Sequence, residues 1–318
     1  MYHVRTGMIL IFGIFLLLLI VPGGLTKINN TDGYFVYAQQ NQSLNSNVTS
    51  PLDLPAKTIH VGDIDIAYRL FGKGESLLLI PGFSMRMDDW EPNVLNKLAS
   101  NNTVIIFDNR GIGKTTPGNK TWSIEQLVND TAGLLDALKI EKPVDVLGFS
   151  LGGFVAQELA LTHPQKVNKL ILYATNCGGK AAIPPQISPA ALKSMISGNA
   201  TKDTFLSTLF PKEWIKEHAG YVQNFILPMT QVSKESIQHQ AQMSPNWKGT
   251  CDRLSSITKL TLIITGTDDV TSPPANSLVL AQKIPGAWLV QIKGGGHGAI
   301  YQYPEEFSKV LLTFLNTT

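Results

Sequence analysis

The chain has 318 residues, of which 43% are hydrophobic and 16% are charged. This length and composition fit one large domain with a well-buried core, or one domain with an insertion. The formal net charge of +2, without a basic run or interleaved basic and aromatic residues, excludes a nucleic-acid-binding protein.

The N-terminal segment has the pattern of an export signal. His3 and Arg5 precede an almost unbroken apolar run at 8–21, which Pro22 and two glycines then end. A basic start, a short apolar run and a polar continuation are typical of a secretory signal, and the run is short for a membrane span. We therefore interpret residues 1–38 as an export signal or N-terminal anchor.

Small residues before position 39 would allow cleavage after Ala38. The following Asn-, Ser- and Gln-rich stretch is too polar to bury a core, which predicts a polar linker over 39–54. We expect the protein to be exported, and then either secreted or anchored to the outer face of the membrane.

Residues 55–176 alternate short apolar or β-branched runs with longer helical patterns. The alternation predicts a mostly parallel α/β sheet with helices on both faces. The continuous apolar run at 76–80 is typical of a strand buried on both faces. In chain order the expected strands are 58–61, 64–71, 76–80, 103–107, 144–147 and 167–173, and the expected helices are 89–99, 123–139 and 151–162.

The alternation stops at 177–250, where amphipathic helical patches occur without strands. We interpret this stretch as a helical cap insertion. The second part of the core, 251–318, resumes the alternation, and ligand sites in such sheets lie at the carboxyl ends of the strands. The insertion is therefore expected to cover the site. The strands expected after it are 260–265 and 288–292, and the helices are 275–284 and 304–316.

Residues 148–152 read Gly-Phe-Ser-Leu-Gly and lie between a predicted buried strand and a predicted helix. A nucleophile elbow requires this context, with glycines where larger side chains would clash with a tight turn. Ser150 is therefore a candidate nucleophile, and a turn serine without chemistry is the alternative. The Leu151 N–H, at a helix N-terminus, would face an oxyanion formed at that serine.

The acid and the base should follow the nucleophile in that order. His297 is the candidate base, because it lies in the glycine-rich stretch 294–298 just beyond the last expected strand. Asp268 and Asp269 both follow the strand at 260–265, and either could hydrogen-bond the His297 Nδ1. The other histidines lie in the N-terminal segment, before the elbow, at a helix end or in the insertion: His3, His60, His163, His218 and His239.

The chain has two cysteines, Cys177 and Cys251. Their spacing does not fit a metal site, since no Cys or His lies close enough in the sequence to complete one. In an exported protein they could pair in a disulfide; otherwise they are two separate small core residues.

Over about residues 57–317 the chain resembles the α/β-hydrolase superfamily, and it looks closest to its capped esterase, lipase and cofactor-free haloperoxidase-like members. In similar proteins the turn that matches Asp108 and Arg110 is structural, so no chemistry is assigned to them. The matching motifs are LLLIPGF at 77–83, FDNRGIGKT at 107–115, GFSLGG at 148–153, THPQKVNKLIL at 162–172, TGTDDVTSP at 265–273 and GGGHGAIYQYPEEF at 294–307.

The resemblance adds two assignments. In similar proteins the acid lies three residues after the glycine and four before the proline of the acid motif, which selects Asp269. The second oxyanion donor follows the glycine of a His-Gly pair, which selects the Phe83 N–H. This chain has Pro81-Gly82 in place of that pair, a departure from the family pattern.

The resemblance implies a serine hydrolase that cleaves a carboxylic ester through an acyl-enzyme intermediate, and the N-terminal segment adds the expectation of export. Ser150, His297 and Asp269 would form its catalytic triad, and Phe83 and Leu151 its oxyanion hole. No metal or cofactor is implied, and the expected partner is a small apolar ester. Perhydrolysis or C–C bond hydrolysis on the same triad is an alternative, and a non-catalytic surface-binding protein is another.

Overall fold

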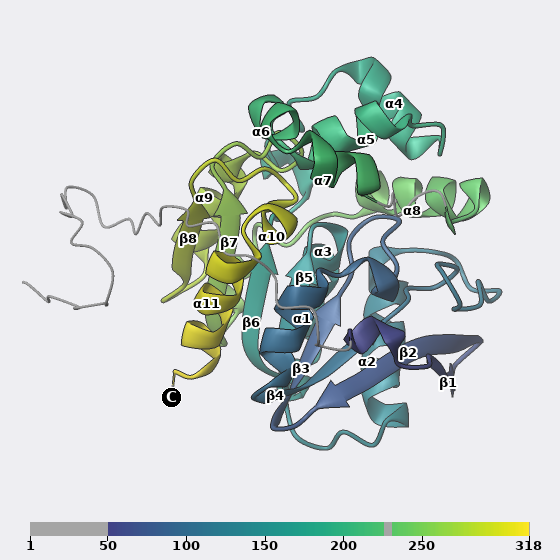
Figure 1. Cartoon of the computed structure of the whole chain (residues 1–318). Coiled ribbons are helices and arrows are strands. Elements are labelled where there is room, and N and C mark those ends of the chain that lie inside the picture. The colour runs from purple at the N-terminus through teal and green to yellow at the C-terminus, as the bar shows by residue number, and fades with distance from the viewer. Residues whose placement is uncertain (1–49, 226–230, 318) are drawn as a thin grey trace, which may run out of the picture. The chain divides into compact units, whose positions relative to one another are not determined.

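The computed structural model describes residues 50–225 and 231–317. The strands in this part of the chain are β1 (Lys57–Val61), β2 (Ile64–Gly72), β3 (Glu75–Ile80), β4 (Asn102–Phe107), β5 (Val144–Phe149), β6 (Val167–Tyr173), β7 (Leu260–Gly266) and β8 (Trp288–Ile292). They form one sheet in the order β1-β2-β4-β3-β5-β6-β7-β8 (Figure 1). β2 pairs antiparallel with β1 and β4, and every other neighbouring pair is parallel. The predicted mostly parallel sheet is confirmed.

The central strands are buried on both faces, as their continuous apolar runs predict. In β3, Leu77 and Leu79 pack into one hydrophobic cluster, whereas Leu78 and Ile80 pack into the other. Successive side chains of a strand point to opposite faces, so an unbroken apolar run supplies both layers at once.

Helices cover both faces of the sheet. α1 (Pro92–Ala99) and α11 (Pro304–Leu315) pack on one face, together with the short α10 (Ala299–Gln302), and α2 (Ile124–Ala137), α3 (Leu151–Thr162) and α9 (Pro274–Lys283) pack on the other. The Ser123 side chain caps α2 by accepting the Gln126 N–H at 3.0 Å. A proline opens α1, α9 and α11, where its missing N–H removes no helical hydrogen bond. The sequence analysis did not anticipate α10.

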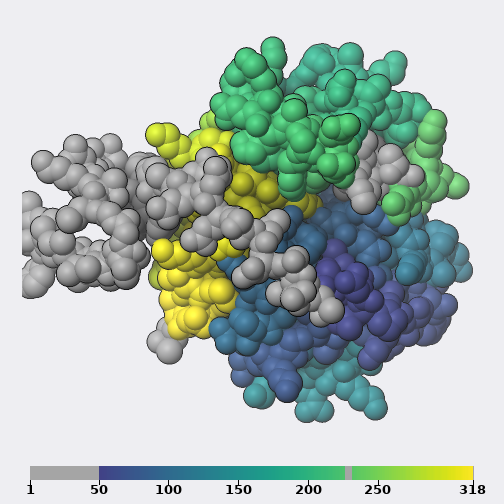
Figure 2. Space-filling model, viewed as in Figure 1, coloured from purple at the N-terminus to yellow at the C-terminus, as the bar shows by residue number. Residues whose placement is uncertain are grey.

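The cap insertion between β6 and β7 contains the helices α4 (Pro189–Ile196), α5 (Lys202–Leu209), α6 (Lys212–Glu217), α7 (Ala219–Asn224) and α8 (Lys234–Asn246). Ser188, Thr201 and Ser233 cap α4, α5 and α8 by accepting a backbone N–H. These helices lie over the carboxyl ends of the parallel strands (Figure 1). The space-filling view shows their green surface in direct contact with the yellow surface of the C-terminal residues (Figure 2).

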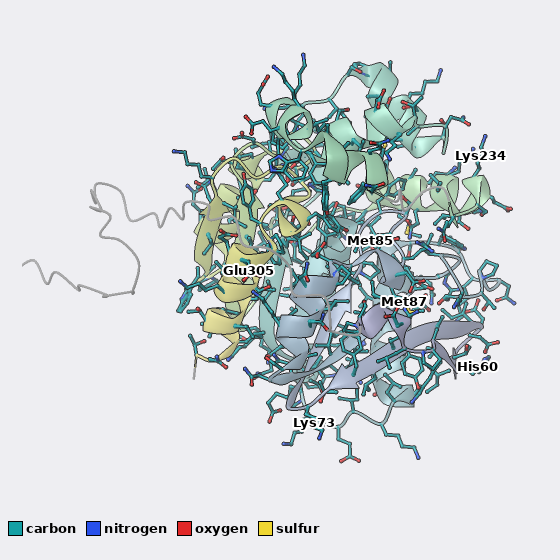
Figure 3. All side chains as sticks on the ribbon, viewed as in Figure 1. His60, Lys73, Met85, Met87, Lys234 and Glu305 are labelled. Atoms are coloured by element: carbon teal, nitrogen blue, oxygen red, sulfur yellow. A yellow bond between two sulfur atoms is a disulfide. The ribbon has the colours of Figure 1, made fainter. Side chains whose placement is uncertain are left out.

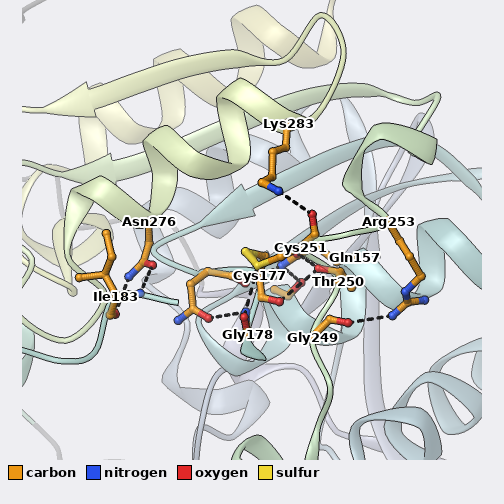
Figure 4. Close-up of a disulfide and its surroundings, with 12 residues drawn as sticks. Gln157, Cys177, Gly178, Ile183, Gly249, Thr250, Cys251, Arg253, Asn276 and Lys283 are labelled. Carbon is orange, nitrogen blue, oxygen red and sulfur yellow. Dashed lines mark hydrogen bonds between the residues drawn. A yellow bond between two sulfur atoms is a disulfide. The ribbon is translucent and has the colours of Figure 1, made fainter. Parts of the chain in front are cut away.

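Cys177 and Cys251 form a disulfide, so the paired alternative is the right one (Figure 4). Cys177 follows β6 and Cys251 precedes β7, and their Cα atoms are 5.0 Å apart although 74 residues separate them in the sequence. The bond therefore joins the two ends of the cap insertion at the point where it leaves the sheet.

The expected export signal or anchor at 1–38 and most of the 39–54 linker lie outside the described residues. Across 50–225 and 231–317, no helix is both long and apolar enough to cross a membrane.

Candidate active site

Ser150 lies on a sharp turn between β5 and α3, with a φ of 52°. A Cβ atom on Gly148 would lie 2.4 Å from the Gly152 carbonyl oxygen, and one on Gly152 would lie 2.2 Å from the Ile80 carbonyl oxygen. Both distances are far below a normal contact, so only glycine fits on either side of the serine.

Besides the Gly153 N–H, which donates to the Ser150 carbonyl at 2.9 Å, two hydrogen bonds to the end of β6 and the residues after it hold the backbone of Ser150 in this unfavourable conformation. Its N–H donates to the Tyr173 carbonyl at 2.9 Å, and its carbonyl accepts the Thr175 hydroxyl at 2.8 Å. A left-handed conformation at a non-glycine residue persists only where its surroundings enforce it. The end of β6 enforces it here.

The imidazole of His297 lies between a serine and a carboxylate. Its Nε2 is 3.0 Å from the Ser150 Oγ, and its Nδ1 is 2.9 Å from the Asp269 Oδ2. A neutral imidazole donates from one nitrogen and accepts at the other. Since the carboxylate accepts at Nδ1, the proton is assigned to Nδ1, and Nε2 is free to accept the Ser150 hydroxyl proton.

Asp269 is buried, and its two carboxylate oxygens have different partners. Oδ1 accepts the backbone N–H groups of Thr271 and Ser272 at 2.8 and 2.7 Å, which leaves Oδ2 for His297. Asp268 is exposed and accepts the hydroxyl of Thr267. The geometry therefore brings Asp269, and not Asp268, to the imidazole.

The loops that carry Asp269 and His297 contact each other and the cap insertion. The Asp268 N–H donates to the Gly295 carbonyl at 2.8 Å, and the Gly298 N–H donates to the Leu209 carbonyl of α5 at 2.8 Å. A Cβ on Gly296 would lie 2.4 Å from that Leu209 oxygen. The glycines of this stretch thus permit a close approach of the insertion.

Tyr173, at the end of β6, supports the histidine and was missed by the sequence analysis. Its hydroxyl donates to the His297 carbonyl at 2.6 Å and accepts the Ile300 N–H at 3.0 Å. Burial raises the pKa of Tyr173 well above its usual value, so the hydroxyl remains a donor. Nothing in the sequence of β6, VNKLILY, distinguishes this hydroxyl as a partner of the histidine loop.

The two expected oxyanion donors lie on segments that touch. Leu151 is the first residue of α3, where backbone N–H groups lack a helical partner. Phe83 lies on the loop after β3, and its N–H donates to no other described residue. The close approach of Gly152 to Ile80 places the start of that loop against the start of α3.

A cavity of about 300 Å³ opens between the cap insertion and the loops of Asp269 and His297. Its wall mixes apolar side chains with polar ones, among them a lysine and a carboxylate. The lining residues include Ile187, Phe210, Lys212, Asp268, Val270 and His297. The cavity therefore borders the loop of His297, but Ser150, Phe83 and Leu151 do not line it. In the described part of the chain, no group of three or more His, Cys, Asp or Glu residues could hold a metal ion.

Comparison with known proteins identifies the family of the fold. The model of the alpha/beta hydrolase fold family matches residues 75–304. Similar proteins include the "Putative carbamate hydrolase RutD" of Azorhizobium caulinodans, 27% identical over 271 residues that cover 80% of this chain and 96% of the relative. A hydrolase from Pseudomonas aeruginosa is 25% identical, with a TM-score of 0.71 over 82% of this chain and 98% of that one. Est816, described as an N-acyl homoserine lactone degrading enzyme, is 26% identical, with a TM-score of 0.68 over 81% and 100% of the two chains.

The chain belongs to the α/β-hydrolase fold family, since the family model covers more than half of its length. Its relatives support a hydrolase that acts on small molecules.

Proposed function

We propose that the protein is an exported serine hydrolase that cleaves a carboxylic ester through an acyl-enzyme intermediate. The observation that supports this proposal most is the continuous hydrogen-bonded chain from the Ser150 Oγ through both nitrogens of His297 to Asp269. The base is within hydrogen-bond reach of both the nucleophile and the orienting carboxylate before any substrate binds.

In the proposed reaction the Ser150 Oγ attacks the ester carbonyl carbon while the His297 Nε2 accepts its proton. Asp269 stabilises the resulting imidazolium and holds its orientation. The carbonyl oxygen becomes an oxyanion, to which the Phe83 and Leu151 N–H groups donate. His297 then returns the proton to the departing alcohol, and a water molecule, activated in the same way, hydrolyses the acyl-enzyme to the acid.

The proposed substrate is a small ester with apolar parts. The lactone named for Est816 is a cyclic ester, which supports this class. A carbamate, named for one of the relatives, offers the same serine a similar carbonyl carbon and is the second substrate class to test.

Turnover of p-nitrophenyl acetate and of a p-nitrophenyl carbamate by the purified protein tests the mechanism. Ser150→Ala should lower turnover at least about a thousandfold, as loss of a triad member does elsewhere. Ser100→Ala, which changes an exposed serine after α1, should leave it unchanged. Equal turnover by wild type and Ser150→Ala would rule the mechanism out.

Export through residues 1–38 is part of the proposal. The disulfide supports it, because structural disulfides persist mainly in oxidising compartments outside the cytoplasm. Cell fractionation with an antibody against the folded domain should place the protein outside the cytoplasm. Recovery of the full-length chain in the cytoplasmic fraction would refute the export.

A further inference from the structure

Helix α8 of the cap insertion makes polar contacts with the loop that follows β3. We call residues 81–87 the oxyanion loop, because this loop carries the Phe83 N–H. The Gln240 Oε1 accepts the Ser84 N–H at 2.7 Å, and the Arg86 guanidinium donates to the Gln231 side chain just before α8. Figure 3 labels Lys234 at the start of α8 and Met85 in the loop below it.

The bond from Ser84 to Gln240 lies at the most constrained point of the loop. Ser84 is fully buried and has a φ of 52°, a left-handed conformation that a non-glycine residue adopts only at a cost. The Ser84 N–H shares one rigid peptide plane with the Phe83 carbonyl. Fixing that plane limits rotation about Phe83, and so helps to fix the direction of the Phe83 N–H.

The two ends of the oxyanion loop are bound to the core, whereas its centre is bound to the cap insertion. The Pro81 carbonyl accepts the Asn109 side chain at 3.4 Å, and the Met87 N–H donates to Asp108 at 2.7 Å. Between these two points, the Ser84 N–H donates to the Gln240 side chain of the cap insertion. The insertion therefore completes the support of the loop.

The orientation of the Gln240 amide follows from its partner. A backbone N–H can only donate, so the oxygen Oε1 must face Ser84 and the nitrogen Nε2 must face away. Gln240 is fully buried, and neither its Nε2 nor the Ser84 Oγ has a hydrogen-bond partner among the described residues. Leaving a buried donor unpaired costs stability, so a residue chosen for packing alone would be apolar here.

We propose that Gln240 is a positioning residue of the oxyanion hole: its side-chain oxygen holds the Ser84 peptide so that the Phe83 N–H points at the reacting oxygen. This inference rests on the proposed serine hydrolase mechanism and deepens it. In this proposal, α8 contributes to the catalytic site through Gln240. Displacement of α8 from the core would therefore weaken the oxyanion hole as well as expose it to solvent.

Variants at position 240 distinguish the contribution of the hydrogen-bond acceptor from that of the rest of the Gln240 side chain. Gln240→Met keeps the length and removes the acceptor, and Gln240→Asn withdraws the acceptor by one methylene. Gln240→Glu keeps an acceptor oxygen for the Ser84 N–H. Gln242→Met, at an exposed position of the same helix, is the matched control.

The readouts are kcat and KM for p-nitrophenyl acetate and the inhibition constant of phenylboronic acid, which forms a tetrahedral adduct on a nucleophilic serine. Removal of a whole oxyanion donor costs about 100- to 1000-fold in kcat, so a misdirected donor should cost about tenfold. We expect Gln240→Met and Gln240→Asn to lose about this factor in kcat and in boronate affinity, with KM little changed. Gln240→Glu should recover most of the loss.

A kcat within twofold of wild type for a folded Gln240→Met would overturn this inference and leave the serine mechanism intact. So would a raised KM with an unchanged kcat, because it would place Gln240 in ordinary substrate binding. If Gln240→Met does not fold, as judged by thermal unfolding, Gln240→Asn carries the same expectation. A wild-type protein without ester turnover or boronate binding would instead overturn the proposed function, and the inference with it.

Discussion

Each of the three residues in the candidate triad is fixed by a contact outside the triad. Thr175 holds the Ser150 carbonyl, Tyr173 holds the His297 carbonyl, and two backbone N–H groups hold the Asp269 Oδ1. Residues whose rotations are already restricted lose little freedom when the reaction begins. The site is therefore assembled before a substrate arrives.

Replacing Asp269 by asparagine should lower ester turnover at least about a hundredfold. The same change costs about ten-thousandfold in another serine hydrolase. The Thr271 and Ser272 N–H groups would retain the asparagine oxygen and turn its NH₂ toward His297. The imidazole would then have to accept at Nδ1 and carry its proton on Nε2, where it could not act as base.

Asp268→Asn is the control for this change, because Asp268 is exposed and its side chain accepts the Thr267 hydroxyl instead of contacting His297. Its turnover should stay within about tenfold of wild type, as expected for a charge outside the reacting groups. Both variants should give the wild-type circular dichroism spectrum. The reverse pattern, with Asp268→Asn inactive and Asp269→Asn active, would move the acid by one residue.

Asp108 should contribute more to the free energy of unfolding at low pH than at neutral pH, which opposes acid denaturation. Burial raises the pKa of Asp108 from 3.8 to about 6, although its oxygens accept the N–H groups of Met87 and Lys114. A carboxyl that binds its proton more tightly in the folded state contributes stability at low pH, and this contribution is lost as pH rises from about 4 to 6. The amount is about 2 kcal/mol between pH 4.5 and 7.

The measurement is urea unfolding of wild type and Asp108→Asn at pH 4.5 and pH 7. The free energy of unfolding of wild type minus that of the variant should be larger at pH 4.5 by about 2 kcal/mol. A difference that does not change with pH, or that grows toward pH 7, would contradict the raised pKa.

The sequence predicts individual site residues where a reactive residue type directly follows an expected strand. Ser150 and His297 stand on glycine-rich turns after expected strands, so their chemistry could be anticipated from the chain alone. Tyr173 and Gln240 could not be anticipated, because their roles depend on which distant backbone groups the fold brings to them. The spacing of the acid motif favoured Asp269, and the structure adds the reason that Asp268 faces solvent.

Among the elements, the strands and core helices follow from the hydrophobic pattern, whereas the bounds of the helices in the cap insertion do not. Every expected strand lies within three residues of the observed one at either end, since buried parallel strands need unbroken apolar runs. The amphipathic patches at 177–250 predict helices in the insertion, but four of the five helices that the structure describes there have only six to eight residues, too few to give their bounds. The four-residue α10 is too short to give a period at all.

The disulfide should contribute a large share of the stability of the insertion. It closes a loop whose ends are 74 residues apart, for which loop-closure entropy gives about 4 kcal/mol. Changing Cys177 and Cys251 together to alanine should lower the free energy of unfolding in urea by about 2–4 kcal/mol. An unchanged unfolding midpoint would show that packing alone holds the two ends of the insertion.

At the scale of the molecule, one sheet brings the ends of four strands together. The oxyanion loop follows β3, Ser150 follows β5, and Asp269 and His297 follow β7 and β8. β3 and β5 are neighbours on either side of the point where the strand order reverses, which is where open α/β sheets bind ligands. The cap insertion then contacts both the histidine loop and the oxyanion loop.

In the proposed mechanism, Ser150 is a nucleophile activated by His297 and Asp269. The most direct test is incubation of the purified protein with a fluorophosphonate, followed by intact mass measurement and peptide mapping. One adduct is expected on Ser150. It should form completely in wild type, much more slowly in Asp269→Asn, and not at all in Ser150→Ala. No adduct on wild type, or an adduct that remains in Ser150→Ala, would contradict this mechanism.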